Sequence, residues 1–346
     1  MEAVGEEYFK ILTSRSFFQP VKSKSSFIMH GCMHDLATFV LGDFGLRLEE
    51  NDLDKLPKRV RHLSIMKKDI HHLKQFDGAF DAKFLRTFLT LNSNASPEQQ
   101  HDVQLPELVS EEKRLRVVSL SHYRSIKDFP ASVENLKHLR YLDLSSTAIR
   151  EIPSTICYLH KLETLLLRGC RNLTRLPAEI RGLLKLRHID LDNCAVKELP
   201  LRIGDLKDLQ TLSRFIVREE EGGSSIKELG KLRNLRGKFD IWGLDNVVDV
   251  ENVSAAKLSD KKFLTRLGLY WQGDSAGSSD PEKHREVLDR LQPYTNLETL
   301  YISGYNGTSF SGWMGHQSFH NIVRVDLIEC GNCNSLSPIE QLPSLK

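Results

Sequence analysis

An apolar phrase of the form Leu-x-x-Leu-x-Leu recurs along most of the chain. It begins at Leu115, Leu139, Leu162, Leu186 and Leu209, so its spacing is nearly constant. A repeat length of about 20–29 residues with this sequence pattern is typical of leucine-rich repeats. Because each such repeat packs mainly against its neighbours, the sequence predicts a solenoid, and binding is the expected function in place of catalysis.

Each repeat contains two apolar patterns. Within the phrase the apolar positions alternate, as one face of a short strand requires. Afterwards they recur at intervals of three, as in Leu176-Pro177, Ile180 and Leu183, which indicates 3₁₀-like turns on the convex side. Proline ends the strand there. The expected fold is therefore an α/β leucine-rich-repeat solenoid with one curved, parallel sheet of about ten strands.

The repeat pattern divides the chain into four segments. Residues 1–45 do not share the repeat and predict a small helical unit with a short strand and a turn at Gln19-Pro20. Residues 46–112 hold weaker phrases and a loop at 92–104, and 113–215 hold the regular repeats. In 216–346 the repeats are irregular and their phrases lie further apart. The chain stops at Lys346, where another repeat would begin, and we expect a truncated, apolar edge there.

Composition restricts the partners and the compartment. Lys plus Arg total 48 and Asp plus Glu total 46, so no strong field selects nucleic acid. We expect no membrane span, because no run of 18 apolar residues occurs. The acidic N-terminus lacks the apolar core of a secretory signal, and six dispersed cysteines fit a reducing compartment. A cytoplasmic location is expected, with a nuclear or membrane-peripheral location left open.

Motifs for catalysis and metal binding are weak in this sequence. It contains no Gly-x-x-x-x-Gly-Lys-Ser/Thr phosphate loop and no Gly-x-Ser-x-Gly nucleophile setting. Cys330 and Cys333 have zinc-like spacing, but no second pair follows at the usual distance. Cys170, Cys194 and Cys330 each follow closely after a strand phrase, where repeats use such side chains to satisfy backbone groups of the turn. We expect no enzyme, no metal and no cofactor for this chain.

The concave face is the expected working surface, because side chains between the apolar positions point there. Mixed charge with tyrosine suits a protein partner, whereas a phosphate-binding stripe would be more uniformly basic. The alternative for each of these residues is that it belongs to an ordinary solvated surface without a role in binding. For the three tryptophans, all in the irregular half, packing between repeats is favoured over a role in an interface. The candidate protein-binding residues are Arg140, Tyr141, Asp143, Glu163, Arg187, His188, Asp190, Tyr301 and Arg324.

Several segments resemble one protein family. Tyr8-Phe9, the run from Ser14 to Gln19, Phe27-Ile28-Met29-His30 and His34-Asp35-Leu36-Ala37 resemble the end of a winged-helix domain. That domain belongs to plant nucleotide-binding leucine-rich-repeat disease-resistance proteins, and the likeness is greatest to their coiled-coil subgroup. The repeats are similar too, as in Leu267-Gly268-Leu269-Tyr270-Trp271. The resemblance covers essentially the whole chain.

This resemblance implies a fragment of an intracellular immune receptor. Its repeats would bind an effector or a host protein and restrain a switch domain in plant defence. The nucleotide-binding domain that holds ADP or ATP in the family would precede Met1, so no nucleotide is expected on this chain. The family's Met-His-Asp switch fits two registers. Met29-His30-Gly31 needs no insertion and makes His30 the switch histidine, with Gly31 in place of aspartate; Met33-His34-Asp35 is the literal match.

Three other functions stay open at this point. A free-standing leucine-rich scaffold for a signalling complex is favoured if the reading frame begins at Met1 with no phosphate loop upstream. A nucleotide hydrolase requires turnover of ATP by the pure chain. A secreted or cell-surface receptor requires glycan occupancy at a sequon such as Asn172.

Overall fold

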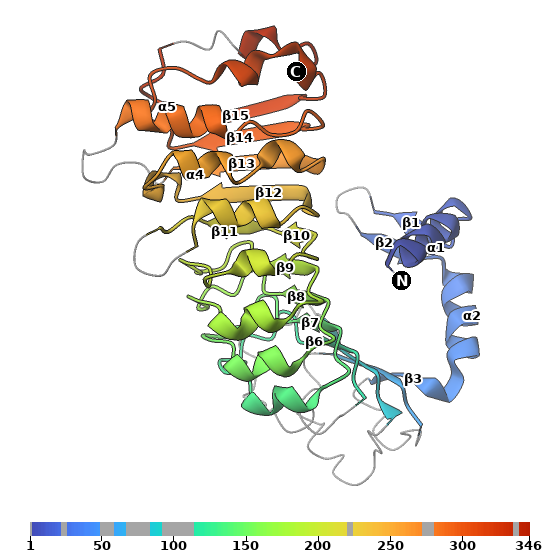
Figure 1. Ribbon diagram of the computed structural model, residues 1–346. Helices are drawn as coiled ribbons and strands as arrows, with labels where there is room; N and C mark the ends of the chain where they lie inside the picture. Colours follow the sequence, from blue (N-terminus) through green and yellow to red (C-terminus); the bar gives the residue numbers. More distant parts are fainter. Residues whose placement is uncertain are drawn as a thin grey trace.

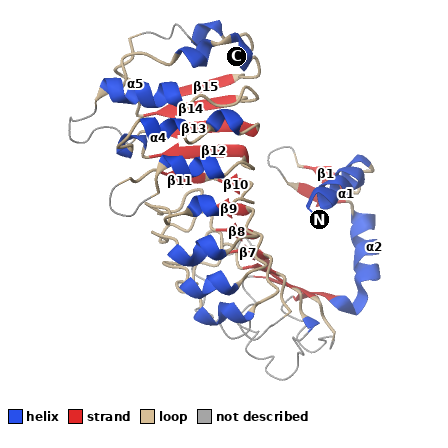
Figure 2. Cartoon of the chain, in the orientation of Figure 1, coloured by secondary structure: helices blue, strands red, loops and turns tan. Residues whose placement is uncertain are grey.

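The computed structural model describes residues 2–21, 26–48, 59–66, 84–91, 114–219, 224–271, 280–334 and 339–346. In these residues the strands form one two-stranded antiparallel sheet and two parallel sheets of eight and five strands. The parallel strands lie side by side along one face of the repeat region, and short helices cover the opposite face (Figure 1, Figure 2). The predicted solenoid is therefore confirmed. The predicted loop at 92–104 and the boundary between 112 and 113 lie outside the described residues.

A small unit precedes the repeats. Phe9 packs its helix onto a hairpin, because its ring lies 5.2 Å from the Phe18 ring and 4.8 Å from the Phe27 ring. The turn predicted at Gln19-Pro20 is wrong: these residues belong to β1, which pairs antiparallel with β2. Proline is tolerated since β1 is an edge strand. The unit comprises α1 (Glu2–Ser14), β1 (Phe18–Pro20), β2 (Phe27–Met29) and α2 (Gly31–Leu41).

The eight-stranded sheet contains the regular repeats. Its order is β10-β9-β8-β7-β6-β5-β4-β3, so each strand pairs with its neighbours in sequence. The leucine and isoleucine positions of each phrase point inward, and Leu142, Leu165 and Ile189 are at most 1% exposed. The strands are β3 (Gly45–Leu48), β4 (His62–Met66), β5 (Thr87–Leu91), β6 (Val117–Ser119), β7 (Tyr141–Asp143), β8 (Thr164–Leu166), β9 (His188–Asp190) and β10 (Thr211–Leu212).

Short 3₁₀ turns follow these strands on the convex side, as the intervals of three predict. Three of them begin directly after Pro130, Pro153 or Pro177, whose fixed φ sets the entry to the turn. The turns of the regular region are η5 (Ala131–Asn135), η6 (Ser154–Tyr158), η7 (Ala178–Gly182) and η8 (Ile203–Asp205), with η1 (Gly42–Phe44) before β3.

The prediction of one continuous sheet is wrong, because the strand pairing changes around Ser213. Thr211 pairs with His188 of the preceding repeat, whereas Arg214 pairs with Asp240 of the following one. The longer irregular repeats therefore start a second sheet of order β11-β12-β13-β14-β15. Its strands are β11 (Arg214–Ile216), β12 (Arg236–Trp242), β13 (Phe263–Tyr270), β14 (Thr299–Ser303) and β15 (Arg324–Ile328).

The described part of the irregular half also carries two α-helices that the apolar pattern did not predict. Asp280 caps the longer one, because its carboxylate accepts the backbone N–H groups of Glu282 and Lys283. The Arg290 guanidinium joins the two helices through a 2.6 Å contact with Glu251. The elements are η9 (Ile226–Lys231), η10 (Leu244–Asn246), α4 (Glu251–Ser254), η11 (Leu258–Asp260), α5 (Pro281–Arg290), η12 (Gly312–Gly315), η13 (Gln317–Phe319) and η14 (Ile339–Gln341).

One hydrophobic core runs through both parallel sheets. Its buried side chains belong to a single cluster that extends from Leu48 to Leu342, so the change of sheet at Ser213 does not divide the solenoid. Among the described helices, none has the length and apolar character needed to cross a bilayer.

Candidate functional site

The outward-facing side chains of the parallel strands form columns across the concave face. Strand pairing places Tyr141, Thr164, His188 and Thr211 in one column. A second column contains Ser119, Asp143, Leu166 and Asp190. Residues one repeat apart in sequence are thus neighbours in space, and one partner can contact several repeats at once.

Most candidate residues of the first sheet already have polar partners. Arg140 Nη1 lies 2.6 Å from Glu163 Oε1. The Asp143 carboxylate accepts the Ser119 hydroxyl at 2.9 Å and the Ser145 backbone N–H at 2.9 Å. These contacts fix the side chains in place before any partner binds. The structure thus pairs Arg140 with Glu163, whereas Asp143 is held by hydrogen bonds from two serine residues.

The other candidates of this sheet lie on or directly beside β7 and β9. His188 Nδ1 lies 2.9 Å from the Thr211 hydroxyl, and Arg187, directly before β9, is half-buried. Burial raises the pKa of Tyr141 to about 12, with a further contribution from the Asp143 carboxylate. Tyr141 therefore acts as a neutral hydrogen-bonding group at physiological pH.

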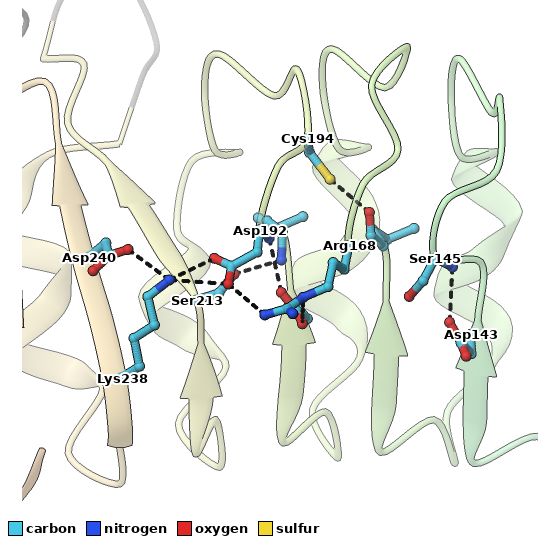
Figure 3. Close-up of polar contacts among 11 residues, drawn as sticks. Asp143, Ser145, Arg168, Asp192, Cys194, Ser213, Lys238 and Asp240 are labelled. Atoms are coloured by element: carbon cyan, nitrogen blue, oxygen red, sulfur yellow. Dashed lines mark hydrogen bonds and ion pairs between the residues drawn. The ribbon is translucent and has the colours of Figure 1, made fainter. Parts of the chain in front are cut away.

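An ion-pair network crosses the junction between the two sheets (Figure 3). Arg168 contacts Asp190 through Nε at 3.1 Å and Asp192 through Nη2 at 2.8 Å. Lys238 Nζ lies 3.1 Å from Asp192 and 3.1 Å from Asp240. The network therefore connects β9 to β12 at the place where the backbone pairing is interrupted.

A broad hollow covers this network. It has a volume of about 1100 Å³ and extends from Thr164 of β8 to Asn321. Its charged residues include both signs, among them Arg168, Asp192 and Lys238. A surface of this size and mixed polarity suits a folded protein surface better than a small enclosed ligand.

The second sheet carries the two remaining concave candidates. Tyr301 packs at 5.1 Å against Tyr270, and Arg324 Nε lies 2.8 Å from Asp326. The structure does not bring these two residues into the network of the first sheet.

Sequence reasoning missed a stacked pair of aromatic residues on the second sheet. Trp242 stacks on Tyr270 with the ring centroids 4.0 Å apart and the planes 7° apart, on the concave side. The packing interpretation is confirmed for Trp271 and Trp313, which are 3% and 7% exposed, and Trp242 also packs between repeats, although its side chain is only partly buried. The alternation in β12 places Trp242 on the same side as Lys238, and this signal was present in the sequence.

Burial also raises the pKa of Asp240, which lies beside these stacked rings, and the pKa of Tyr270, which is one of them. Asp240 is 5% exposed, and this burial raises the pKa of its carboxyl group in spite of the nearby Lys238. Burial raises the pKa of Tyr270 to about 12. Both shifts come from removing the groups from water, which disfavours their charged forms.

The predicted switch residues lie at the start of α2. His30 occupies the N-cap position without a capping hydrogen bond from its side chain, and His34 Nδ1 lies 3.5 Å from Asp35 Oδ1. All three side chains are exposed. The two imidazoles can donate hydrogen bonds to a phosphate, whereas the Asp35 carboxylate would repel one. Within the described residues no group of three or more His, Cys, Asp or Glu side chains is arranged to hold a metal ion.

The buried cysteines bond to backbone as the repeat pattern predicts. The Cys170 thiol donates to the Leu144 carbonyl at 3.1 Å, and the Cys194 thiol donates to the Leu167 carbonyl at 2.8 Å. Each thiol thus satisfies a turn carbonyl of the preceding repeat. The neighbouring Cys170 thiol, together with burial, raises the pKa of Cys194, so this thiol is poorly suited to nucleophilic chemistry.

Three family models match the chain. Residues 1–37 match the "Disease resistance protein Winged helix domain", 113–171 match "Leucine rich repeat", and 226–346 match "R13L1/DRL21 LRRs". The fold itself resembles a leucine-rich-repeat protein of Leptospira interrogans, with a TM-score of 0.50, 20% identity and coverage of 88% of this chain and 87% of that one. These matches define a winged-helix end followed by a leucine-rich-repeat solenoid.

Curated relatives align with the whole chain. It is 45% identical to "Putative disease resistance RPP13-like protein 1" of Arabidopsis thaliana, covering 100% of this chain and 33% of the relative. It is 34% identical to "Putative disease resistance protein RGA1" of Solanum bulbocastanum, covering 100% of this chain and 32% of the relative. The chain spans about a third of the length of these relatives. The predicted resemblance to plant disease-resistance proteins with leucine-rich repeats is therefore confirmed over the whole chain.

Proposed function

We propose that this chain is the recognition part of an intracellular plant immune receptor. Its leucine-rich repeats bind a pathogen effector or a host protein, and they restrain a nucleotide-dependent switch domain until that partner arrives. The observation that carries this proposal is a long concave surface, fixed by ion pairs, directly after the end of a winged-helix domain. The disease-resistance names of relatives that align with the whole chain support the role in plant defence.

The exposed apolar surface of α2 supports contact with the rest of such a receptor. Leu36, Phe39 and Val40 are 51%, 84% and 74% exposed, and no residue of this helix is buried. Leaving such side chains in water costs hydrophobic free energy that a packed neighbour would recover. In our proposal this neighbour is the nucleotide-binding module of the receptor, which would hold ADP or ATP, with His30 facing its phosphates.

Titration calorimetry between the chain and the nucleotide-binding module of a family member tests the restraining role. We expect association at micromolar concentration. The double variant Phe39→Ser, Val40→Ser should weaken it at least about tenfold, because two exposed apolar contacts are lost. Leu184→Ser serves as the matched control, since Leu184 is 64% exposed in the repeat region. Absence of association at micromolar concentration would overturn the restraining role.

A further inference from the structure

Four side chains from consecutive strands form a stack on the concave face of the second sheet. The Arg214 guanidinium lies 4.5 Å from the centre of the Trp242 ring. Trp242 stacks on Tyr270 at 4.0 Å, and Tyr270 packs against Tyr301 at 5.1 Å. We call these residues the aromatic stack. Tryptophan, tyrosine and arginine are the residue types that contribute most to protein interfaces.

Gly268 makes the aromatic stack possible. Strand pairing places Gly268, and not Tyr270, opposite Tyr301. A Cβ at position 268 would collide with the Asp240 carboxylate and with the Tyr270 ring. Both groups therefore occupy the space that a side chain at this position would fill. The stack is therefore rigid before a partner binds, and binding to it costs little side-chain entropy.

A basic hollow adjoins the Arg214 end of the stack. It has a volume of about 510 Å³, and Trp242 and Ile216 form apolar parts of its wall. Lys197, Arg214 and Arg218 bring three cations, while the described residues lining it include no carboxylate. One of these cations, Arg218, pairs with a neighbouring glutamate at 3.2 Å. Because Lys197 and Arg214 contribute two further positive charges, the hollow remains net positive.

Several buried polar atoms around the stack have unused hydrogen-bonding capacity. Arg214 Nε, Asp240 Oδ1, Trp242 Nε1 and Arg266 Nε have no hydrogen-bond partner within the part of the chain that the structure describes. Buried polar atoms of folded proteins nearly always find partners. Four such atoms gathered around the stack therefore mark this part of the concave face as incompletely paired in the free chain.

We infer that the aromatic stack and the adjoining hollow are the docking site for a protein segment that presents an acidic side chain beside an aromatic or aliphatic one. The carboxylate lies in the hollow against Arg214, whose planar fork matches two carboxylate oxygens. The apolar neighbour packs on Trp242 and Tyr270. This inference rests on the proposed function and specifies where and how the repeats contact their partner.

Charge on the neighbouring surface favours a single carboxylate over a nucleic acid. Asp190 and Asp192 lie on the concave face of the first sheet, and Asp326 lies on β15, beyond Tyr301. A phosphate chain passing along the face would meet these carboxylates, whereas one acidic side chain needs only the basic hollow.

Selection of random dodecapeptides displayed on phage, with the full chain as bait, tests this inference. We expect enriched peptides to share Asp or Glu next to an aromatic or aliphatic residue. The enriched peptide, made synthetically, should lose at least about tenfold in affinity with Arg214→Ala or Trp242→Ala, and also when its acid is replaced by the amide. Arg214→Lys should give an intermediate loss, because it retains the charge but not the fork.

Matched controls use exposed arginine and aromatic residues outside the site. Arg150→Ala and Tyr158→Ala should leave affinity unchanged, and circular dichroism checks that every variant folds. Failure to enrich peptides, enrichment without an acid, equal binding to the Arg214 and Trp242 variants, or displacement by single-stranded DNA at physiological salt would each overturn the inference. The calorimetric association through α2 does not involve Arg214, so its persistence in those cases would leave the restraining role intact.

Discussion

Replacing Lys261 by methionine tests whether one buried amino group governs the pH dependence of folding. Lys261 is 1% exposed, and its Nζ donates to the carbonyl oxygens of Leu229 at 2.7 Å and Leu232 at 2.9 Å, at the end of η9. Burial lowers the pKa of this ammonium to about 8, from 10.5. The folded state therefore holds the proton less tightly than the unfolded state does.

The sign and size of the effect follow from these two pKa values. Between pH 8 and 10.5 the unfolded chain binds more protons at Lys261, so the free energy of unfolding rises with pH. The gain between pH 7 and pH 10 is about 2.5 kcal/mol. Lys261→Met removes the titrating group, and the stability difference between wild type and variant should therefore change by about 2.5 kcal/mol in favour of wild type over this range.

Urea unfolding of both proteins, followed by circular dichroism at each pH from 7 to 10, measures this difference. Tyrosines with raised pKa, such as Tyr305, contribute equally to both proteins and cancel. Lys227→Met is the matched control, because Lys227 is an exposed residue of η9, the turn whose carbonyls Lys261 contacts. The difference in unfolding free energy between this variant and wild type should not change with pH. A flat difference for Lys261→Met as well would refute the reasoning and show that the two carbonyls keep the ammonium charged.

Three further changes test the packing of the repeats and the aromatic stack. Leu165→Ala, at a position that is 0% exposed, should lower the free energy of unfolding by about 2–5 kcal/mol in urea, whereas the exposed Leu184→Ala should change it by less than about 0.5 kcal/mol. Glu228→Gln should cost about 1–3 kcal/mol by the same measurement, since this buried carboxylate accepts two backbone N–H groups of the η8 turn; an unchanged midpoint would contradict the capping role. Gly268→Ala should displace the Asp240 carboxylate and alter tryptophan fluorescence, and an unaltered spectrum would contradict the close approach.

The regular repeats could be predicted because each strand is specified locally. Alternating apolar positions, as in Leu139 to Leu144, fix which side chains of the strand point inward, and a proline such as Pro153 fixes the start of the next turn. Both signals lie within a single repeat, so they need no information about neighbouring repeats. The structure confirms strand and turn at these positions.

The aromatic stack could not be predicted in this way, because it depends on register between distant segments. Trp242 and Tyr270 belong to successive irregular repeats, and their pairing follows from a register shift at Gly237, a glycine with φ of 69°. The apolar pattern does not specify such a bulge. The α5 helix is a different case. Asp280-Pro281 signals its start locally, but an analysis of apolar spacing alone does not use this signal.

The distribution of unpaired charge leads us to expect that the second sheet is the more selective part of the concave face. Carboxylates of the first sheet already neutralise neighbouring cations, as Asp192 does for Arg168 and for Lys238 of β12. An incoming charged group would have to compete with these existing pairs, which reduces its net gain in free energy. Around Arg214 no carboxylate of the described residues lines the hollow, so a partner's acid meets this guanidinium without displacing an acid, while Arg218 already pairs with a glutamate. Partner selection by charge is therefore expected to come from the irregular repeats, while the paired residues of the first sheet hold the surface in shape.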